Sequence, residues 1–330
     1  MARFLLRRAL HAFLLVLITL TVTFFVLRLA PGDPVSRFYA PGIDTQTMEH
    51  IRGALGLDEP LPVQYAKTVW SYLRGDFGVS TTSHRPVSEI LAETIPRTLA
   101  LTLTALALQV ALGLLLGALS ARHPYGAVDR TLSVGFLVFY SIPSFYLAFI
   151  LIAIFSVELG WLPSANMQTI PPEARGFFAA LADGAAHAVL PVAVLALGSA
   201  AALARYARGS LLDAVHQDFV KTARAKGLAE NRIFWVHAMK NAAPQVLTVV
   251  GLSVPFLLGG AVVIEKIFAW PGMGSLVVDS IFARDYPVVL AVNFVGACMV
   301  ILGNLLADVS YAWLNPRVRY GGNTGSGGSG

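Results

Sequence analysis

The stretch TLALTLTALALQVALGLLLGALS, residues 98–120, decides the fold class of this chain because it contains no Asp, Glu, Lys or Arg. About 20 helical residues cross a hydrocarbon core of roughly 30 Å, so this stretch is long enough to span a membrane. A backbone in lipid must satisfy its own polar groups, and a single segment can do so only as a helix. The stretch therefore predicts a transmembrane helix.

The rest of the chain extends this pattern. Of its 330 residues, 56% are hydrophobic and 13% are charged, about half the charged share of a typical soluble protein. The chain has one cysteine, which excludes an internal disulfide scaffold. We therefore expect an all-α membrane protein with six transmembrane helices, at residues 9–29, 98–120, 131–155, 187–207, 244–264 and 288–311.

The distribution of charge predicts which side of the membrane each segment faces. With the N-terminus inside, the inner segments hold 14 basic and 5 acidic residues, whereas the outer segments hold 10 basic and 14 acidic residues. Excess Lys and Arg marks the cytoplasmic side, so both termini are expected inside. The net charge of +5 is then a topology signal and does not indicate a nucleic-acid partner. The first apolar run is long and lacks a small-residue cleavage pattern, which predicts an uncleaved anchor.

The outer part of the chain is concentrated in one insertion. Residues 1–29 form the first span, and residues 30–97 are too long for a plain loop between spans. Helical pieces are expected at 45–55 and 62–74, and the alternative is a mobile hydrophilic loop. A small packed cap is suggested by three apolar residues of the second piece, Trp70, Tyr72 and Leu73.

The remainder forms a core of five spans at residues 98–319, with one long inner segment at 208–243. Residues 320–330 are rich in Gly and Ser, so we expect an appended flexible linker there. Small residues recur at a spacing of four within two spans, which lets helices approach closely in lipid. These pairs are Gly113 with Gly117 and Gly198 with Ala202.

The sequence offers no catalytic constellation. HExxH, CxxC, P-loop and GxSxG patterns do not occur, which disfavours an enzyme. Arg28 and Asp308 lie near the ends of their spans, whereas ion-coupled carriers usually hold ionisable groups near the middle. We therefore expect a transporter that takes its energy from a partner, with an ion-coupled carrier or channel lacking an ATPase as the alternative class. His187, at the outer end of a span, is expected to be an interfacial or capping residue.

The inner segment predicts a helix, a turn and a second helix. The first helix is expected to end near Lys226, and Gly227 suits the C′ position, which requires a positive φ. The second helix starts near Glu230, and its apolar face is expected to consist of Ile233, Val236, Met239 or Lys240, and Ala243. This segment could enter a groove of a partner protein or lie as a basic amphipathic helix on anionic lipid.

The inner segment also resembles a known motif. The runs TARAKGL (222–228) and HAMKNA (237–242) are similar to the coupling loop of ABC importer permeases. More narrowly, the chain resembles the first permease subunit of dipeptide, oligopeptide and nickel importers over residues 1–319. Further matching motifs are APGDP (30–34), LGLD (55–58), GDFGVS (75–80), FAWPGMG (268–274), ARDYP (283–287) and NPR (315–317). The chain departs from the general pattern at Lys221, where many importers have Glu, and at Lys240, where a Pro is expected.

The resemblance implies a type I ABC importer permease in a bacterial inner membrane. The implied partners are a second permease, two cytoplasmic ATPases that bind ATP and Mg, an extracytoplasmic binding protein and membrane lipid; the chain itself would bind no cofactor and no metal. Peptides are the implied substrates, and glutathione or nickel chelates are the alternatives. We expect coupling to the ATPases through Asp218, Phe219, Ala223, Arg224 and Gly227, with an apolar contact from Phe219 and Ala223 and an ion pair from Arg224. Candidates for the translocation path are Ser141, Pro143, Ser144, Pro255 and Asn293, and the two prolines are expected to kink their spans.

Overall fold

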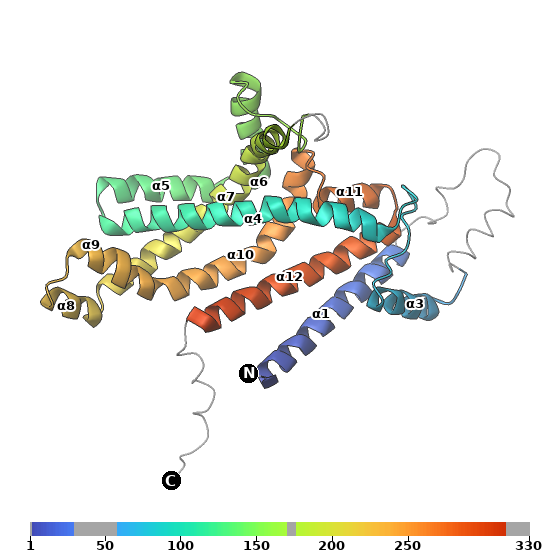
Figure 1. The fold of residues 1–330 in the computed structure, drawn as a ribbon, viewed down its shortest axis with the longest axis horizontal. Coiled ribbons are helices and arrows are strands. Elements are labelled where there is room, and N and C mark those ends of the chain that lie inside the picture. The colour runs from blue at the N-terminus through green and yellow to red at the C-terminus, as the bar shows by residue number, and fades with distance from the viewer. Residues whose placement is uncertain (1, 30–57, 170–175, 315–330) are drawn as a thin grey trace, which may run out of the picture. The chain divides into compact units, whose positions relative to one another are not determined.

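A computed structural model describes residues 2–29, 58–169 and 176–314 of the chain (Figure 1). The described part is helical, and its only β-type pairing is an isolated bridge between Val79 and Pro86. The chain forms two compact units, one made of residues 1–98 and 271–301 and the other of residues 99–270 and 302–330. The expected helix at 45–55 and the linker at 320–330 lie outside the described residues.

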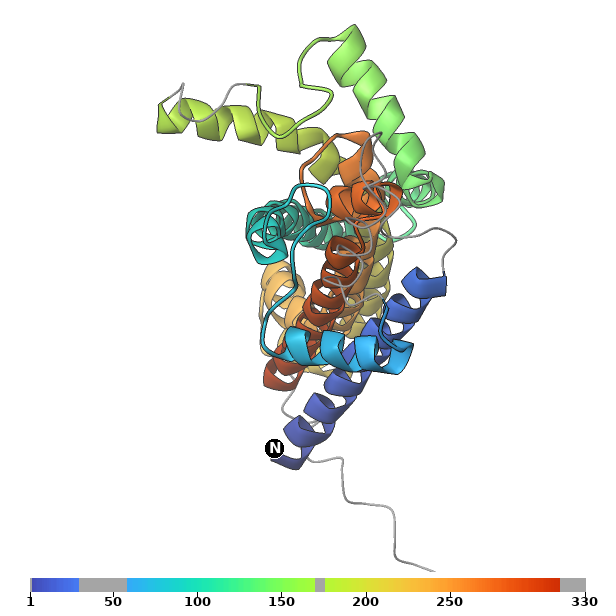
Figure 2. The same ribbon diagram turned by 90° about the vertical axis from the view of Figure 1, so that its right-hand side faces the viewer.

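The first unit combines helices from both ends of the chain. Its helices are α1 (Ala2–Leu29), α3 (Leu61–Leu73), the first part of α4 (Val87–Arg122), α11 (Met273–Phe282) and most of α12 (Tyr286–Leu314). Figure 2 shows α3 crossing α1, and the two helices are in contact. α3 begins one residue before the predicted piece: Pro60 is its N-cap, and Pro62 lies in its first turn, where proline is favoured.

The packed cap that was expected on α3 depends on Tyr72. Its ring packs edge-on against Phe77 and Phe294, and the three rings lie in a core that also contains residues of α4 and α12. Trp70 and Leu73 are exposed, so their part in the expected cap is wrong. At 3.6 residues per turn, Trp70 lies about 160° and Leu73 about 100° around the helix from Tyr72, so neither shares the face that Tyr72 presents to this core.

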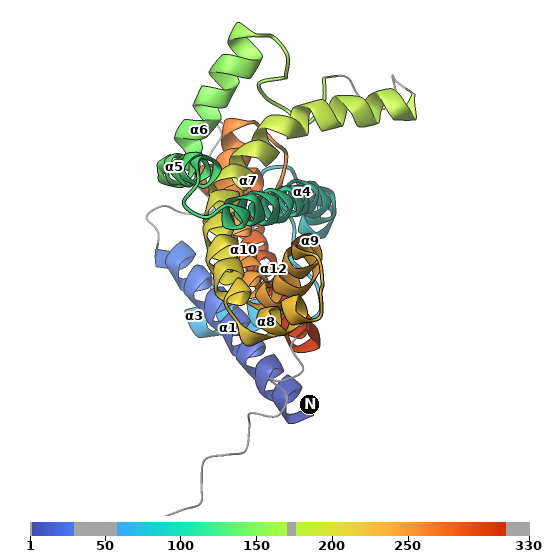
Figure 3. The ribbon, with the colours of Figure 1, turned by 90° about the vertical axis from the view of Figure 1, so that its left-hand side faces the viewer.

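The second unit is organised by α7 (Phe177–Val215), which contacts both α5 and α10 (Figure 3). Its other elements are the last part of α4, α5 (Ala127–Ser141), α6 (Ser144–Leu151), the π-helix η2 (Ile152–Glu158), α8 (Asp218–Ala225), α9 (Glu230–Arg232), the π-helix η4 (Ile233–Ala238) and α10 (Met239–Ile267). α7 begins ten residues before His187, so that residue is buried inside the helix and does not cap its end. The His187 Nδ1 atom lies 2.8 Å from the Asp183 carbonyl oxygen.

The predicted contact through small residues occurs between α4 and α7. A Cβ atom added at Gly113 would lie 2.8 Å from the Leu203 side chain. A Cβ atom added at Gly117 would lie 2.7 Å from the Ala204 carbonyl oxygen. Both distances are too short for real atoms, so only glycine permits this approach of the two helices.

The described residues contain four helices long and apolar enough to cross a membrane, or five if a bent pair counts as one span. The four segments are Leu10–Leu29, Val87–Arg122, Phe177–Val215 and Tyr286–Leu305. The span predicted at 131–155 is bent where a kink was expected, at Pro143: α5 and the helix that follows Pro143 meet at 104°. The bend is visible in Figure 1. Proline disfavours the helical conformation of the residue before it, and Ile142 is extended with ψ 123°. The span predicted at 244–264 falls in α10, where the side chains of residues 254–260 are not described.

Candidate functional site

The turn after α8 has the conformation that the sequence predicted. Gly227 has φ +75°, and its N–H donates to the Arg224 carbonyl oxygen at 2.9 Å. The N–H of Leu228 donates to the Ala223 carbonyl oxygen at 3.2 Å, which closes the helix end. Few side chains tolerate a positive φ, so glycine at this position fixes the angle between α8 and the chain that follows.

The apolar face of α8 packs within the chain. Val220 and Ala223 are buried against Ile233, and Phe219 and Leu228 complete this cluster. Phe219 and Ala223, the two residues expected to form an apolar contact with an ATPase, therefore hold α8 against η4 in the single chain. The face of α8 that remains exposed is polar and carries Asp218, whose Oδ1 atom accepts a hydrogen bond from Lys221 at 2.8 Å.

Arg224 also has a partner within the chain. Its Nε atom donates to Glu230 Oε1 at 2.6 Å, and its Nη2 atom donates to Oε2 of the same carboxylate at 3.2 Å. The hydrogen bonds from Arg224 hold the pKa of the exposed Glu230 carboxyl below its usual value. Sequence reasoning named Arg224 and missed its partner, although a glycine turn brings residues on its two sides close together.

The predicted apolar face of the second helix is confirmed at Ile233 and Met239 and is wrong at Val236. The buried residues there are Ile233, Phe234, Ala238 and Ala242, whereas Val236 is 53% exposed. Residues 233–238 form a π-helix, whose hydrogen bonds reach one residue further than those of an α-helix. Because a π-helix has more residues per turn than the 3.6 of an α-helix, each side chain after Ile233 points in a different direction around the helix axis from the one that an α-helix would give. It also leaves Trp235, which sequence reasoning did not select, 42% exposed beside Val236.

A cavity of about 440 Å³ lies in the second unit between α5, α6, α7 and α10. Its wall is mostly apolar, with hydroxyl groups from Ser144, Ser199 and Ser253. The other lining residues are Phe139, Tyr140, Ile142, Val194, Leu195, Gly198, Ala202, Val249 and Leu252. Gly198 and Ala202, selected above for their spacing, thus face this cavity.

Of the five candidates for the translocation path, Ser144 lines this cavity. Ser141 and Pro143 are exposed and are not among its lining residues. Pro255 lies in α10, in the stretch whose side chains are not described. Asn293 belongs to the first unit, where its Nδ2 atom donates to the Val289 carbonyl oxygen at 3.0 Å.

A buried ion pair joins the start of α5 to α7. Asp129 is 3% exposed, and each of its carboxylate oxygens accepts a hydrogen bond of 2.7 Å from Arg208. The same carboxylate accepts further hydrogen bonds from the Ser120 hydroxyl and from the Tyr125 N–H. From the sequence, Asp129 and Arg208 are only two charges on the predicted inner side, 79 positions apart. Among the described residues, no group of His, Cys, Asp and Glu could hold a metal ion.

The fold is that of membrane-spanning ABC transporter subunits. A chain of the inward-facing MetNI methionine ABC transporter aligns with a TM-score of 0.55 and 19% identity, covering 68% of this chain and 96% of that one. A second crystal form of the same transporter aligns with a TM-score of 0.53 and 20% identity, with the same coverage.

The sequence comparisons define the family more closely. The model of the binding-protein-dependent transport system inner membrane component matches residues 113–320, and the model of its N-terminal region matches residues 1–102. The chain belongs to this family. It is 39% identical over 321 residues to the oligopeptide transport system permease protein AppB of Bacillus subtilis, covering 97% of this chain and all of the relative. It is also 39% and 38% identical to the glutathione transport system permease proteins GsiC of Salmonella paratyphi A and Escherichia coli K12, with the same coverage. The expected multi-pass inner-membrane transport subunit, which is not an enzyme, is therefore confirmed at the level of the family.

Proposed function

We propose that this chain is the transmembrane permease subunit of an ATP-driven importer that carries peptides across the bacterial inner membrane. The observation that carries the proposal is its full-length similarity to permeases of oligopeptide and glutathione transport systems. Glutathione is the first alternative substrate, because several relatives are named for it. A nickel chelate is the second alternative and rests on the sequence motifs alone.

The proposed topology has six spans with both termini inside. It is supported by the excess of basic residues on the predicted inner side and by the long helices α1, α4, α7, α10 and α12. The bent pair of α5 and α6 with η2 would be the third span, entering and leaving the bilayer at different angles. In this topology α8 and Gly227 face the cytoplasm, and residues 30–97 face the outside.

The proposed complex contains this chain, a second similar permease, two cytoplasmic ATPases and an extracytoplasmic binding protein. ATP and Mg would bind to the ATPases, and this chain would bind neither. The binding protein would meet the outer insertion and release substrate above the spans. Membrane lipid would cover the exposed apolar side chains of α1, which include Leu10, Phe13, Leu15 and Val26.

In the proposed mechanism, closure of the ATPases moves α8, and the spans then alternate between inward- and outward-facing states. Two contacts support this step: the Arg224–Glu230 pair joins α8 to α9, and the buried contact between Ala223 and Ile233 joins α8 to η4. η4 continues directly into α10, which lines the cavity. A movement of α8 would therefore be transmitted through η4 to α10. The exposed polar face of α8 would meet the ATPase.

The cavity in the second unit is the proposed section of the translocation path. Its volume of about 440 Å³ lies in the range of small-molecule sites, and its hydroxyl groups can bind peptide amides without holding them strongly. We also propose that four other residues lie along the path: Ser141 at the end of α5, Pro143 just before α6, Pro255 in α10 and Asn293 in α12.

The test is import into proteoliposomes that contain the complete transporter. Labelled dialanine and trialanine should accumulate only with internal ATP and external binding protein, and glutathione and a nickel–histidine chelate serve as competitors. Import by this chain alone without ATP would instead support the ion-coupled carrier. Import of glutathione or the chelate, but of neither peptide, would assign an alternative substrate.

A further inference from the structure

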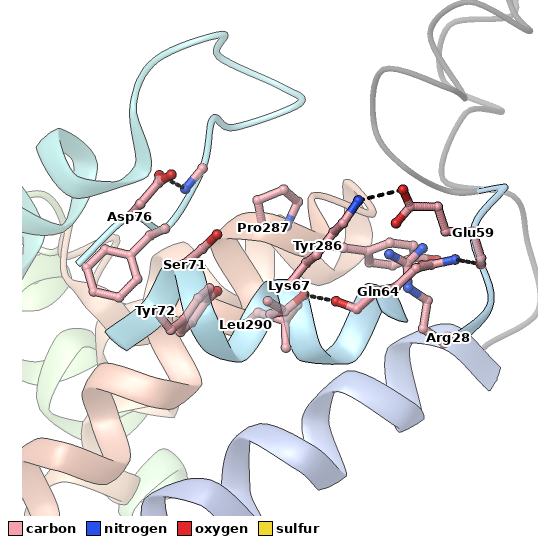
Figure 4. Close-up of a pocket in the computed structure, with 13 residues that line it drawn as sticks. Arg28, Glu59, Gln64, Lys67, Ser71, Tyr72, Asp76, Tyr286, Pro287 and Leu290 are labelled. Atoms are coloured by element: carbon pink, nitrogen blue, oxygen red, sulfur yellow. Dashed lines mark hydrogen bonds and ion pairs between the residues drawn. The ribbon is translucent and has the colours of Figure 1, made fainter. Parts of the chain in front are cut away.

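A second cavity, of about 270 Å³, lies within the first unit (Figure 4). One wall is a single face of α3, because Gln64, Lys67, Thr68, Ser71 and Tyr72 are spaced by helical turns. The last turn of α1, the loop after α3 and the start of α12 supply the rest. From position 64 to position 72 an α-helix rises about 12 Å, so the cavity is elongated.

The two ends of the cavity carry opposite charges. Asp76 lies at the end near Tyr72, and Arg28 lies at the other end near Gln64 and Glu59, as Figure 4 shows. Glu59 and Lys67 form an ion pair of 2.5 Å and so neutralise each other.

Neither end charge is neutralised by an ion pair among the described residues. Arg28 lies over the ring of Phe24, 5.5 Å from its centre. One oxygen of Asp76 accepts a hydrogen bond of 2.9 Å from the Gly78 N–H. A positive group at one end and a negative group at the other favour a ligand that carries both signs of charge.

Buried polar atoms in the wall lack a hydrogen-bond partner within the described residues. They include the hydroxyl of Tyr72, a residue that is 8% exposed, and Glu59 Oε2. Burial raises the pKa of the Tyr72 phenol, so the hydroxyl stays protonated and can donate. The carboxylate oxygen of Glu59 can only accept. A peptide bond offers the complements to both, since it carries a C=O acceptor and an N–H donor.

We propose that this cavity binds a short peptide with free ends, its ammonium group toward Asp76 and its carboxylate group toward Arg28. A length of about 12 Å corresponds to three or four extended residues at about 3.3–3.6 Å each. The wall also contains Phe77, Pro287 and Leu290, which can contact apolar side chains of the peptide. The inference rests on the proposed function, because a peptide importer of the proposed topology would expose this cavity to peptide on the outer side.

The test measures binding of trialanine to the full-length chain in lipid nanodiscs, without binding protein and without ATP. The probes are trialanine, N-acetyl-trialanine and trialanine amide, with free alanine as a length control. A charge-assisted hydrogen bond is lost when either end is blocked, so each blocked peptide should bind roughly tenfold more weakly than trialanine. Free alanine, which cannot reach both charges, should bind more weakly still.

Two variants test which end of the peptide binds to Arg28 and which binds to Asp76. Arg28→Gln should weaken the binding of trialanine roughly tenfold and leave the affinity for trialanine amide unchanged. Asp76→Asn should weaken the binding of trialanine by a similar factor and leave the affinity for N-acetyl-trialanine unchanged. Arg74→Gln and Glu89→Gln, whose side chains lie outside the cavity, are the matched controls and should bind like the parent. A variant that failed to fold would lose affinity for all three peptides alike. In contrast, each folded variant is expected to keep its affinity for one of the blocked peptides.

The proposal is overturned if the parent chain shows no saturable trialanine binding. It is also overturned if Arg28→Gln loses as much affinity for trialanine amide as for trialanine, or if Asp76→Asn loses as much affinity for N-acetyl-trialanine as for trialanine. Import in proteoliposomes separates this failure from failure of the proposed function: ATP-driven peptide import without nanodisc binding would reject the site alone. Selective nanodisc binding without ATP-driven import would reject the proposed function and retain the site.

Discussion

The hydroxyl of Ser80 donates a hydrogen bond of 2.5 Å to Asp285 Oδ2, across 205 positions of sequence. The same buried carboxylate accepts hydrogen bonds of 3.1 Å from the N–H groups of Thr81 and Thr82. Asp285 directly precedes α12, and Ser80 lies in the loop between α3 and α4. One carboxylate therefore fixes the loop between α3 and α4 to the start of α12.

Asp285→Asn should destabilise this loop, because an amide nitrogen cannot accept the hydrogen bonds that the carboxylate receives. Hydrogen bonds to a charged group contribute about 1.5–3 kcal/mol each, so we expect a loss of about 2 kcal/mol or more. Chemical unfolding in detergent would measure it. The control is Asp279→Asn on the exposed side of α11, and an equal effect of both variants would contradict the role of Asp285.

Asp129→Asn should also be destabilising, because it leaves the Arg208 guanidinium without its charged partner. Removing one member of a buried pair costs about 3–5 kcal/mol, and the partial exposure of Arg208 reduces our expectation to about 2 kcal/mol. Unfolding of Asp129→Asn, Arg208→Gln and the double variant forms a double-mutant cycle. Strict additivity of the two single effects would show that the pair is not coupled. Asp213→Asn, exposed on α7, is the control.

Gly117→Ala should push α4 and α7 apart, since its new Cβ atom would meet the Ala204 carbonyl oxygen at 2.7 Å. Overpacking typically costs about 1–3 kcal/mol. Gly135→Ala is the matched control, because a Cβ atom there meets nothing within 4 Å. Alanine favours a helix over glycine by about 1 kcal/mol, so the control should be neutral or stabilising. Thermal unfolding that ranks the two variants in the reverse order would refute the close approach.

Gly227→Pro should sharply reduce transport-coupled ATPase activity while membrane insertion stays normal. Proline fixes φ near −65°, and Gly227 has φ +75°. The turn between α8 and α9 would therefore change direction. The measurement is substrate-stimulated ATPase activity of the reconstituted transporter, with Gly209→Ala as a control in an open environment on α7. Normal stimulated turnover in Gly227→Pro would contradict the proposed movement of α8.

Arg224→Glu should reduce stimulated ATPase activity by placing two carboxylates side by side. The charge swap Arg224→Glu with Glu230→Arg then decides what Arg224 contacts. Recovery of activity in the double variant assigns Arg224 to the intramolecular pair with Glu230 seen here. If activity stays low while the double variant folds normally, Arg224 acts through the ATPase, as the sequence motif implies.

Features that depend on neighbouring positions were predictable from the sequence. The positive φ of Gly227 followed from the helix before it, and the close approach at Gly113 and Gly117 followed from their spacing. The burial of Phe234 and Ala238 in place of Val236 was not predictable, because a π-helix cannot be recognised from a period of 3.6.

Long-range pairs could not be predicted either. Asp129 and Arg208 are 79 positions apart, and Ser80 and Asp285 are 205 positions apart. Which charges meet depends on the rotation of each helix about its axis, and that rotation is set by packing. The cavity of the first unit escaped detection for the same reason, since its end charges come from α1 and from the loop after α3.

The contact between α8 and η4 has a consequence for assembly. Because Val220 and Ala223 are already buried and Arg224 is already paired, α8 is ordered in the single chain. An ATPase that binds it would not have to order a disordered loop, so association would lose less conformational entropy. The charge pattern on the exposed face of α8 and its turn, which includes Lys221 and Lys226, would then determine which ATPases bind.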